Sequence, residues 1–418
     1  MAKPWRGGRK RGTARTMPVM THRVWACLSV ALPAAAVAAA APRQFEFVPG
    51  GNAAGHPVYD AARGFGFEPD EPRQFSVRLA EGNYRITVRL GGGAVPGRTT
   101  VLAEQRRLML EDVHTPKRKT LDRDFIVNVR TPLLASPPPN APGGSSVRLK
   151  PRELASSSWD DRLTLEFAGL APQVASVDIA PVDLPTLYLA GDSTVADQAA
   201  ASAASWGQML PRFFAPRIAV ANHAESGETL KSFVTALRLE KLLANLRPGD
   251  WVMIQFGHND QKPQWPQTYV EAATTYRSWL RVYLAEVRRH GATPILVTSP
   301  ERRNFDGAGH IVPSHGDYPR AVREVAAEEH VALIDLEDMT RRFYEALGAG
   351  RAARAFADDG RDRTHHDEYG ARSLARMVVE GIRAADPELI GGLAAYIAED
   401  AGRFDPSRPE PPSPGGAP

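Results

Sequence analysis

The hydrophobic pattern of the chain changes near residue 183, and this change constrains the fold more than any other feature. Before it, apolar and polar residues alternate in short runs, such as 84–90, which follows the turn residues Glu81-Gly82-Asn83. After it, the apolar runs are continuous and helical segments separate them. A chain of 418 residues also exceeds the ~250–300 residues that one core usually serves. We therefore expect two folded parts.

The first part is predicted to be an all-β sandwich over residues 44–183. Period-2 alternation with turn residues between the runs is typical of antiparallel strands, which we expect at 44–48, 75–79, 84–90, 107–110, 125–129 and 162–167. The stretch 136–146 contains four prolines and is expected to form a surface loop.

The second part, residues 184–403, is predicted to be a three-layer α/β/α domain. Its continuous apolar runs indicate strands that are buried on both faces, at 187–190, 218–220, 251–254, 294–297 and 332–334. The clearest helix is expected between Tyr269 and Val287, ending at Gly291. Active sites of parallel sheets lie at the carboxyl ends of the strands. The tail, 404–418, is rich in proline and serine, so we expect it to be disordered.

The N-terminus has the pattern of a secretory signal peptide, assigned here to residues 1–40. Seven basic residues and no acidic one occur in 1–41, around an apolar run at 24–40 that ends in alanines. The alternative is an uncleaved anchor, for which a run of this length broken by Pro33 is short. We expect a secreted or periplasmic protein. Its only cysteine, Cys27, lies in the apolar run, so the mature chain would hold no disulfide.

Charge argues against nucleic acid as a partner. Without residues 1–41 the 51 basic residues of the chain fall to 44, against 48 acidic ones. A slightly acidic protein lacks the electrostatic attraction to phosphates on which nucleic-acid binding depends.

A candidate nucleophile follows the first strand of the second part. Ser193, in Gly191-Asp192-Ser193-Thr194, lies where the chain is expected to turn from a strand into a helix. Such a turn presents the serine hydroxyl and its N–H at the edge of the sheet. The alternative is a helix cap, because Asp, Ser and Thr are all good capping residues.

Three further groups follow later strands or precede the last helix. Gly227 and Asn259 come after the second and third strands and could donate to a developing oxyanion, although such residues are also common in turns. Asp362 and His365 are three residues apart, so the carboxylate can reach Nδ1 and leave Nε2 free to take a proton. A solvated polar loop is the alternative. A zinc site is less favoured, because adjacent His365 and His366 point apart and no third ligand is evident.

Four motifs thus occur in a fixed order along the chain: the serine turn, Gly227, Asn259 and the pair of Asp362 with His365. This is the order and spacing of the SGNH, or GDSL, hydrolase superfamily, which residues 186–385 resemble. The resemblance implies a flavodoxin-like fold and a catalytic triad of Ser193, His365 and Asp362. It also implies an oxyanion hole formed by Ser193, Gly227 and Asn259, with no cofactor and no metal. Thr194 stands where leucine is common in the family, a departure that leaves the mechanism unaffected.

Longer motifs narrow the resemblance to rhamnogalacturonan acetylesterases. They are Gly-Asp-Ser-Thr-Val-Ala-Asp (191–197), Phe-Gly-His-Asn-Asp-Gln-Lys (256–262) and Asp-x-Thr-His (362–365) with Gly370-Ala371 after it. The segments 82–88 and 106–111 resemble the galactose-binding-like domain that accompanies those enzymes. The resemblance implies a secreted carbohydrate esterase that removes acetyl groups from a plant cell-wall polysaccharide such as pectic rhamnogalacturonan. Its partner would be that polysaccharide, and it would act as a monomer, off the membrane once the signal is cleaved.

Three alternatives stay open at this point. An acetyl xylan esterase would carry the same motifs. A lipase or thioesterase would want apolar loops at the active face, whereas 301–304 and 310–317 are polar. A non-catalytic polysaccharide-binding protein would lack a nucleophile or base, and all are present.

The segment Glu301 to Phe305 follows the fourth strand and could meet an acidic polymer, with a solvated, exposed charged loop as the alternative. Trp206, Trp265 and Tyr318 could stack on sugars, although Trp206 is expected to pack in the core. His258 is expected to play a structural role, with contact to a sugar as the alternative.

Overall fold

The computed structural model describes residues 42–47, 55–135, 137, 140 and 143–410. The predicted signal peptide, 1–40, lies outside the described residues. Among the helices of the described part, none combines the length and hydropathy that crossing a bilayer requires.

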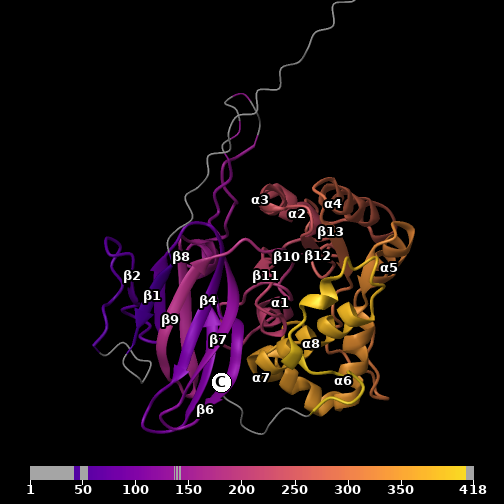
Figure 1. Cartoon of the computed structure of the whole chain (residues 1–418). Helices are drawn as coiled ribbons and strands as arrows, with labels where there is room; N and C mark the ends of the chain where they lie inside the picture. Colours follow the sequence, from indigo (N-terminus) through magenta and orange to yellow (C-terminus); the bar gives the residue numbers. More distant parts are fainter. Residues whose placement is uncertain (1–41, 48–54, 136, 138–139, 141–142, 411–418) are drawn as a thin grey trace, which may run out of the picture. The chain divides into compact units, whose positions relative to one another are not determined.

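A parallel five-stranded sheet is the centre of the second part, as the continuous apolar runs predict (Figure 1). Its spatial order is β11-β10-β12-β13-β14. The strands are β10 (Thr186–Gly191), β11 (Ala219–Asn222), β12 (Trp251–Gln255), β13 (Thr293–Val297) and β14 (Ala332–Ile334). Every residue of β10, β11 and β12 is buried, because helices cover both faces of the sheet.

Alternate residues of β10 pack into two separate cores. Leu187 and Leu189 belong to the core under α1, α6 and α8, whereas Tyr188 and Ala190 belong to the core under α2 to α5 (Figure 1). The helices are α1 (Trp206–Met209), α2 (Leu230–Thr235), α3 (Arg238–Asn245), α4 (Arg277–Arg289), α5 (Tyr318–Glu328), α6 (Leu336–Ala352), α7 (Ala357–Gly360) and α8 (Glu368–Ala384). The predicted three-layer α/β/α fold is therefore confirmed.

One predicted helix begins later than expected. Its α-helical part is α4, which starts at Arg277 after a single π-helical turn, Ala272–Tyr276, so Tyr269 lies outside it. The buried positions still repeat at helical spacing through Tyr276, Leu280 and Leu284. Short 3₁₀ helices complete the chain, at Pro151–Glu153, Ser157–Trp159, Leu210–Phe213, Ala353–Ala355, Leu393–Tyr396 and Glu399–Ala401.

The first part consists of two antiparallel sheets whose inner faces share one core, as predicted. One sheet has the order β1-β9-β4-β7, with β1 (Arg43–Glu46), β9 (Val174–Pro181), β4 (Gly82–Gly91) and β7 (Thr120–Val129). The other has the order β2-β3-β8-β5-β6, with β2 (Phe65–Phe67), β3 (Gln74–Arg78), β8 (Arg162–Ala171), β5 (Gly97–Ala103) and β6 (Arg107–Thr115).

The strands β2, β5 and β9 were not expected from the sequence. In β5 the buried positions include Gly97 and Thr99, which are too small or too polar to give a visible hydrophobic alternation. Opposite β9 the register shifts between Arg89 and Leu90, and such an irregularity breaks the period of two.

The C-terminal segment differs from the disorder expected of it. Phe404 packs against the core under α8, and the hydroxyl of Tyr369 in α8 donates to the carbonyl of Glu410 at 2.6 Å. Residues 404–410 therefore lie against the α/β part. The rest of the expected tail, 411–418, lies outside the described residues.

A buried ion pair joins the sandwich to the α/β part. Nε of Arg107, at the start of β6, lies 2.7 Å from Oδ2 of Asp197 in the segment after β10. The two side chains are only 2% and 5% exposed. Asp197 also accepts from Ser158 Oγ at 3.1 Å and from Asn222 Nδ2 at 2.8 Å. The segment that follows the candidate nucleophile is thus held by the sandwich.

We expect Arg107→Met to lower the free energy of unfolding by about 3 kcal/mol, because it leaves a buried carboxylate without its cation. Urea unfolding followed by fluorescence measures the change. The matched control is Arg89→Met, which breaks an arginine–aspartate pair of 2.8 Å with side chains about half exposed. This control should leave the unfolding midpoint unchanged. Equal losses in the two variants would contradict the importance of the buried pair.

Candidate active site

Ser193 lies on a turn that its neighbours hold in place. Asp192 Oδ1 accepts from the N–H of Thr194 at 3.0 Å and from its hydroxyl at 2.9 Å. Thr194 Oγ1 in turn accepts from Gln255 Nε2 of β12 at 2.7 Å. Burial opposes ionisation of Asp192, but contacts with His258 and Thr194 outweigh it and lower its pKa. The expected helix does not begin here, because the next helix, α1, starts at Trp206 with Ser205 as its N-cap. The helix cap considered as an alternative is therefore wrong as well, and Asp192 stabilises an isolated turn instead.

The structure brings Ser193, His365 and Asp362 into one line of hydrogen bonds. Oγ of Ser193 lies 2.9 Å from Nε2 of His365, and Nδ1 of His365 lies 2.7 Å from Oδ2 of Asp362. The other oxygen of Asp362 accepts from the N–H groups of Thr364 at 2.6 Å and His365 at 2.9 Å. Burial raises the pKa of Asp362, but these hydrogen bonds outweigh it and hold the pKa below its usual value. The arrangement can move a proton from the serine hydroxyl to the imidazole.

Gly227 and Asn259 lie in the same cleft as Ser193. Gly227 has a φ of +80°, a conformation that favours glycine. The backbone N–H groups of Ser193 and Gly227 donate to no acceptor within the described part of the chain. They are available to a bound oxygen.

The side-chain amide of Asn259 is fixed at both ends. Its Nδ2 donates to the carbonyl of Glu228 at 3.0 Å, and its Oδ1 accepts from Nζ of Lys262 at 2.7 Å. The second hydrogen of Nδ2 remains for a ligand in the cleft. Asp260 joins the loop to α2, accepting from the N–H groups of Gly257 at 3.0 Å and Leu230 at 2.9 Å. Burial raises the pKa of Asp260 to about 7.

The cleft has a volume of about 610 Å³ and a polar, cationic lining. Besides the residues above, it is lined by Lys150, Arg152, Ser226, His258, Lys262, Trp265, Arg302 and Thr364. A second hollow of about 480 Å³ shares Arg152, Ser226 and His365 with it and extends toward Trp159 and Gln105 of the first part. Sequence reasoning missed Lys150 and Arg152. They precede the first parallel strand by more than thirty residues, and only docking of the two parts brings them here.

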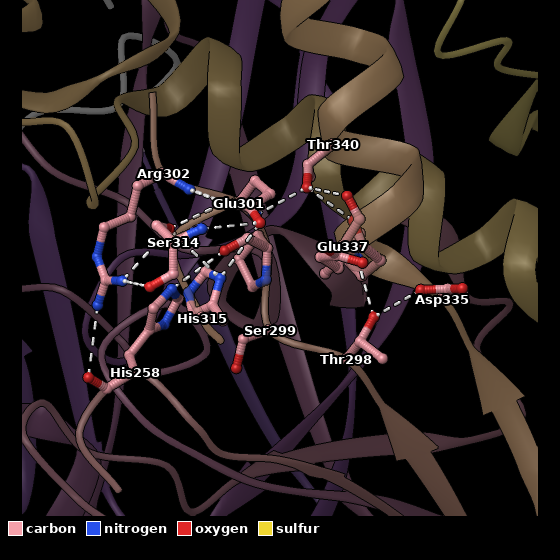
Figure 2. Close-up of polar contacts among 12 residues, drawn as sticks. His258, Thr298, Ser299, Glu301, Arg302, Ser314, His315, Asp335, Glu337 and Thr340 are labelled. Carbon is pink, nitrogen blue, oxygen red and sulfur yellow. Dashed lines mark hydrogen bonds and ion pairs between the residues drawn. The ribbon is translucent and has the colours of Figure 1, made fainter. Parts of the chain in front are cut away.

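Glu301 was expected on an exposed loop, but it is 1% exposed and sits at the centre of a polar network (Figure 2). Its Oε2 accepts from Ser314 Oγ at 2.8 Å and from the Arg302 N–H at 3.1 Å, and its own N–H donates to Thr340 Oγ1 at 2.9 Å. Burial opposes ionisation, but hydrogen bonding and charge at His315 lower the pKa of Glu301. Figure 2 shows Arg302 extending from this network toward His258, whose carbonyl accepts from its Nη2 at 3.5 Å. The network therefore places Arg302 in the cleft.

The other residues singled out in the sequence have distinct places. His258 is 2% exposed, and its Nε2 lies 3.1 Å from the carbonyl oxygen of Pro300. Burial lowers the pKa of His258 to about 4, so the ring is neutral at neutral pH. Trp265 is 39% exposed at the rim of the cleft. His366 points away from His365 and lies 2.6 Å from the Tyr344 hydroxyl. Within the described residues no three His, Cys, Asp or Glu side chains are placed to hold a metal ion.

Comparison with known proteins places this geometry in a family. The model of the GDSL-like lipase/acylhydrolase family matches residues 189–372, a range that contains Ser193, Gly227, Asn259, Asp362 and His365. The chain is 39% identical over 209 residues to rhamnogalacturonan acetylesterase RhgT of Bacillus subtilis (strain 168), covering 47% of this chain and 88% of that protein. Probable rhamnogalacturonan acetylesterase YesY of the same organism is 36% identical over 200 residues, covering 47% and 92%.

The crystal structure of protein YxiM from Bacillus subtilis matches a longer stretch, covering 82% of this chain and 98% of that one, with 24% identity and a TM-score of 0.47. Two relatives above 30% identity are matched over nearly their whole length, and the family model spans the strand ends that carry the site. The chain therefore belongs to the GDSL-like lipase/acylhydrolase family of ester hydrolases.

Proposed function

We propose that this chain is a secreted carbohydrate esterase that removes acetyl groups from a pectic polysaccharide, rhamnogalacturonan, through an acetyl-enzyme on Ser193. The observation that carries the proposal is the line of hydrogen bonds from Ser193 through His365 to Asp362, at 2.9 and 2.7 Å. Similarity to two proteins named as rhamnogalacturonan acetylesterases supports the acetyl ester and the sugar polymer. Export rests on the sequence pattern of residues 1–40 alone.

In the first half of the reaction, Oγ of Ser193 attacks the acetyl carbonyl carbon and its proton passes to Nε2 of His365. The N–H groups of Ser193 and Gly227 and the amide of Asn259 stabilise the tetrahedral oxyanion. His365 then returns the proton to the sugar oxygen as the bond between that oxygen and the acetyl carbon breaks. The sugar leaves with a free hydroxyl, and Ser193 carries the acetyl group.

In the second half, water attacks the acetyl carbon and gives its proton to Nε2 of His365. The tetrahedral intermediate collapses, the bond to Ser193 breaks, and Oγ recovers the proton from His365. Acetate leaves. Asp362 stabilises the imidazolium twice in each cycle, and its lowered pKa keeps it ionised when His365 is charged.

Two cations of the cleft favour an acidic polymer over neutral xylan. Among the described residues, neither Lys262 nor Arg302 forms an ion pair with a carboxylate. Lys262 lies 4.1 Å above the ring of Trp265, and Arg302 is held by neutral oxygens such as the Ser314 carbonyl at 3.2 Å. Cations that make no carboxylate ion pair, beside an exposed tryptophan, suit a uronate, which has a carboxylate and an apolar sugar face. A lipase or thioesterase would instead want an apolar surface here.

We expect Asp362→Asn to lower kcat about 10⁴-fold with little change in KM. The two loop N–H groups require an acceptor at the position of Oδ1, so the new amide must turn its NH₂ toward Nδ1 of His365. This forces the tautomer with hydrogen on Nε2, which cannot accept from Ser193. Kinetics of 4-nitrophenyl acetate hydrolysis measure the effect.

The matched control for this variant is Asp359→Asn, three residues earlier, at an exposed position with a φ of +55° that asparagine tolerates. It should retain wild-type kinetics. A loss of less than tenfold in Asp362→Asn, in a folded protein, would contradict the proposed role of the carboxylate.

We expect kcat/KM for acetate release to be higher on acetylated rhamnogalacturonan than on acetylated xylan. Raising NaCl from 50 to 500 mM should lower only the value on the acidic polymer. Arg302→Gln should reduce the ratio of acidic to neutral kcat/KM on the order of tenfold, the scale of one charge-assisted hydrogen bond. The ratio is measured from the rates of acetate release on the two polymers, prepared with the same acetyl content.

The control for charge alone is Arg123→Gln, an exposed arginine of the sandwich that also has no carboxylate ion pair among the described residues. It should leave the ratio unchanged. A ratio near one in the wild type, insensitive to salt, would refute the assignment of an acidic polymer and favour an acetyl xylan esterase.

A further inference from the structure

A short segment of the first part reaches the loop that carries Gly227. The segment is Lys150 with the 3₁₀ helix Pro151–Glu153, outside the stretch matched by the family model. The segment is anchored to the α/β part, because Glu153 forms an ion pair with Arg238 at the start of α3. The side chain of Arg238 is fully buried. The backbone N–H of Lys150 donates to Oε2 of Glu153 at 2.8 Å, which fixes where the segment begins.

Both cations of this segment donate to one carbonyl oxygen. Nζ of Lys150 and Nη2 of Arg152 each lie 2.5 Å from the backbone oxygen of Ser226. Each cation is also held by a carboxylate of the same loop. Nζ of Lys150 lies 2.6 Å from Oε1 of Glu228, and Nε of Arg152 donates to Oε1 of Glu225 at 2.7 Å. Two charged donors on one acceptor make a strong and well-oriented contact.

The oxygen that they bind belongs to the peptide group of the candidate oxyanion donor. The carbonyl of Ser226 and the N–H of Gly227 are parts of one planar peptide, and the described chain contains no cis peptide. In a trans peptide the C=O and N–H point in opposite directions. Cations that hold the carbonyl on one side therefore aim the N–H to the other side, where it meets no protein acceptor among the described residues.

We infer that Lys150 and Arg152 are positioning residues for catalysis, which orient and polarise the Ser226–Gly227 peptide so that the Gly227 N–H binds the oxyanion more strongly. Positive charge at the carbonyl oxygen draws electron density toward it and makes the N–H of the same peptide a better donor. The gain appears when the carbonyl oxygen of the ester becomes negative, so it raises kcat rather than substrate affinity. The inference rests on the proposed function, since it concerns the oxyanion of that reaction.

The same contacts reach the other donor of the oxyanion hole. Glu228, 1% exposed, is the carboxylate that Lys150 binds, and its backbone carbonyl accepts from the amide of Asn259. The side chain of Glu228 also accepts from Ser232 of α2. Lys150 thus fixes the loop that contains both Gly227 and Glu228. The Gly227 N–H of this loop points to the oxyanion, and the Glu228 carbonyl orients the amide of Asn259. The sandwich thereby helps to build the active site.

The experiment uses the full-length protein and the small ester 4-nitrophenyl acetate, which leaves polymer binding out of the measurement. Lys150→Met and Arg152→Met should each lower kcat about tenfold, less than the 10²–10³-fold loss of a whole donor, with KM within about threefold. Affinity for phenylboronic acid, which forms an anionic tetrahedral adduct on a serine, should fall by the same factor as kcat. Lys150→Arg and Arg152→Lys should restore most of the rate, because a cation again reaches the carbonyl.

A matched control is Lys119→Met, and it should behave as wild type. Lys119 is an exposed lysine of the sandwich whose side chain makes no hydrogen bond or ion pair with the described residues. Because Lys150→Met leaves Glu228 short of a cation, Lys150→Met/Glu228→Gln removes the buried charge as well. If that double variant regains wild-type kcat, Lys150 serves only to neutralise Glu228 and the inference is wrong. Unchanged kcat in both single variants, or a loss of kcat without loss of boronate affinity, would also overturn it. An inactive wild type would instead refute the proposed function.

Discussion

The site depends on the hydrogen bond between Ser193 and His365, which joins residues 172 positions apart in the chain. The two side chains meet because β10 ends at Gly191 and the loop before α8 returns to the same edge of the parallel sheet. The direction of proton transfer is then set by Asp362, whose two oxygens are committed to different partners. One fixes the loop through two backbone N–H groups, and the other fixes the tautomer of His365.

A second constraint comes from the sandwich, which contacts the α/β part through charged side chains as well as through the connecting chain. Arg107 holds Asp197 beyond the nucleophile, and Lys150 and Arg152 hold the loop with Gly227. Arg107 and Asp197 are buried, and a buried charge is costly unless it is paired, so this contact favours one docking arrangement. The sequence predicts a galactose-binding-like domain here. Its contacts hold the loop of Gly227 and the segment after Ser193.

Much of this could be predicted from the sequence, because the relevant signals are local. Ser193, Gly227 and Asn259 follow continuous apolar strands, and the resemblance to SGNH hydrolases implied that Asp362 and His365 join them. The fold class is confirmed. The strand β5 escaped prediction because its buried residues include glycine and threonine. Lys150 and Arg152 escaped because their function depends on how two folded parts dock, which leaves no periodic pattern.

Glu301 shows why loop residues are the hardest to interpret. A charged residue after a strand is usually exposed, yet here partners from three segments of the chain, Arg302, Ser314 and Thr340, surround it. Glu301 is buried by contacts with residues up to 39 positions away. The sequence next to Glu301 contains no pattern that predicts these contacts. The network holds Arg302 in the cleft, where we propose that it meets the acidic polymer.

The central claim is that Ser193 is the nucleophile, and covalent labelling tests it most directly. A fluorophosphonate reacts with a serine whose proton a neighbouring base removes, and it stays attached. Peptide mass mapping of the treated full-length protein should find one adduct per chain, on Ser193. The variants Ser193→Ala and His365→Ala should remain unlabelled under the same conditions. An adduct on another serine, or equal labelling of Ser193→Ala, would contradict the account.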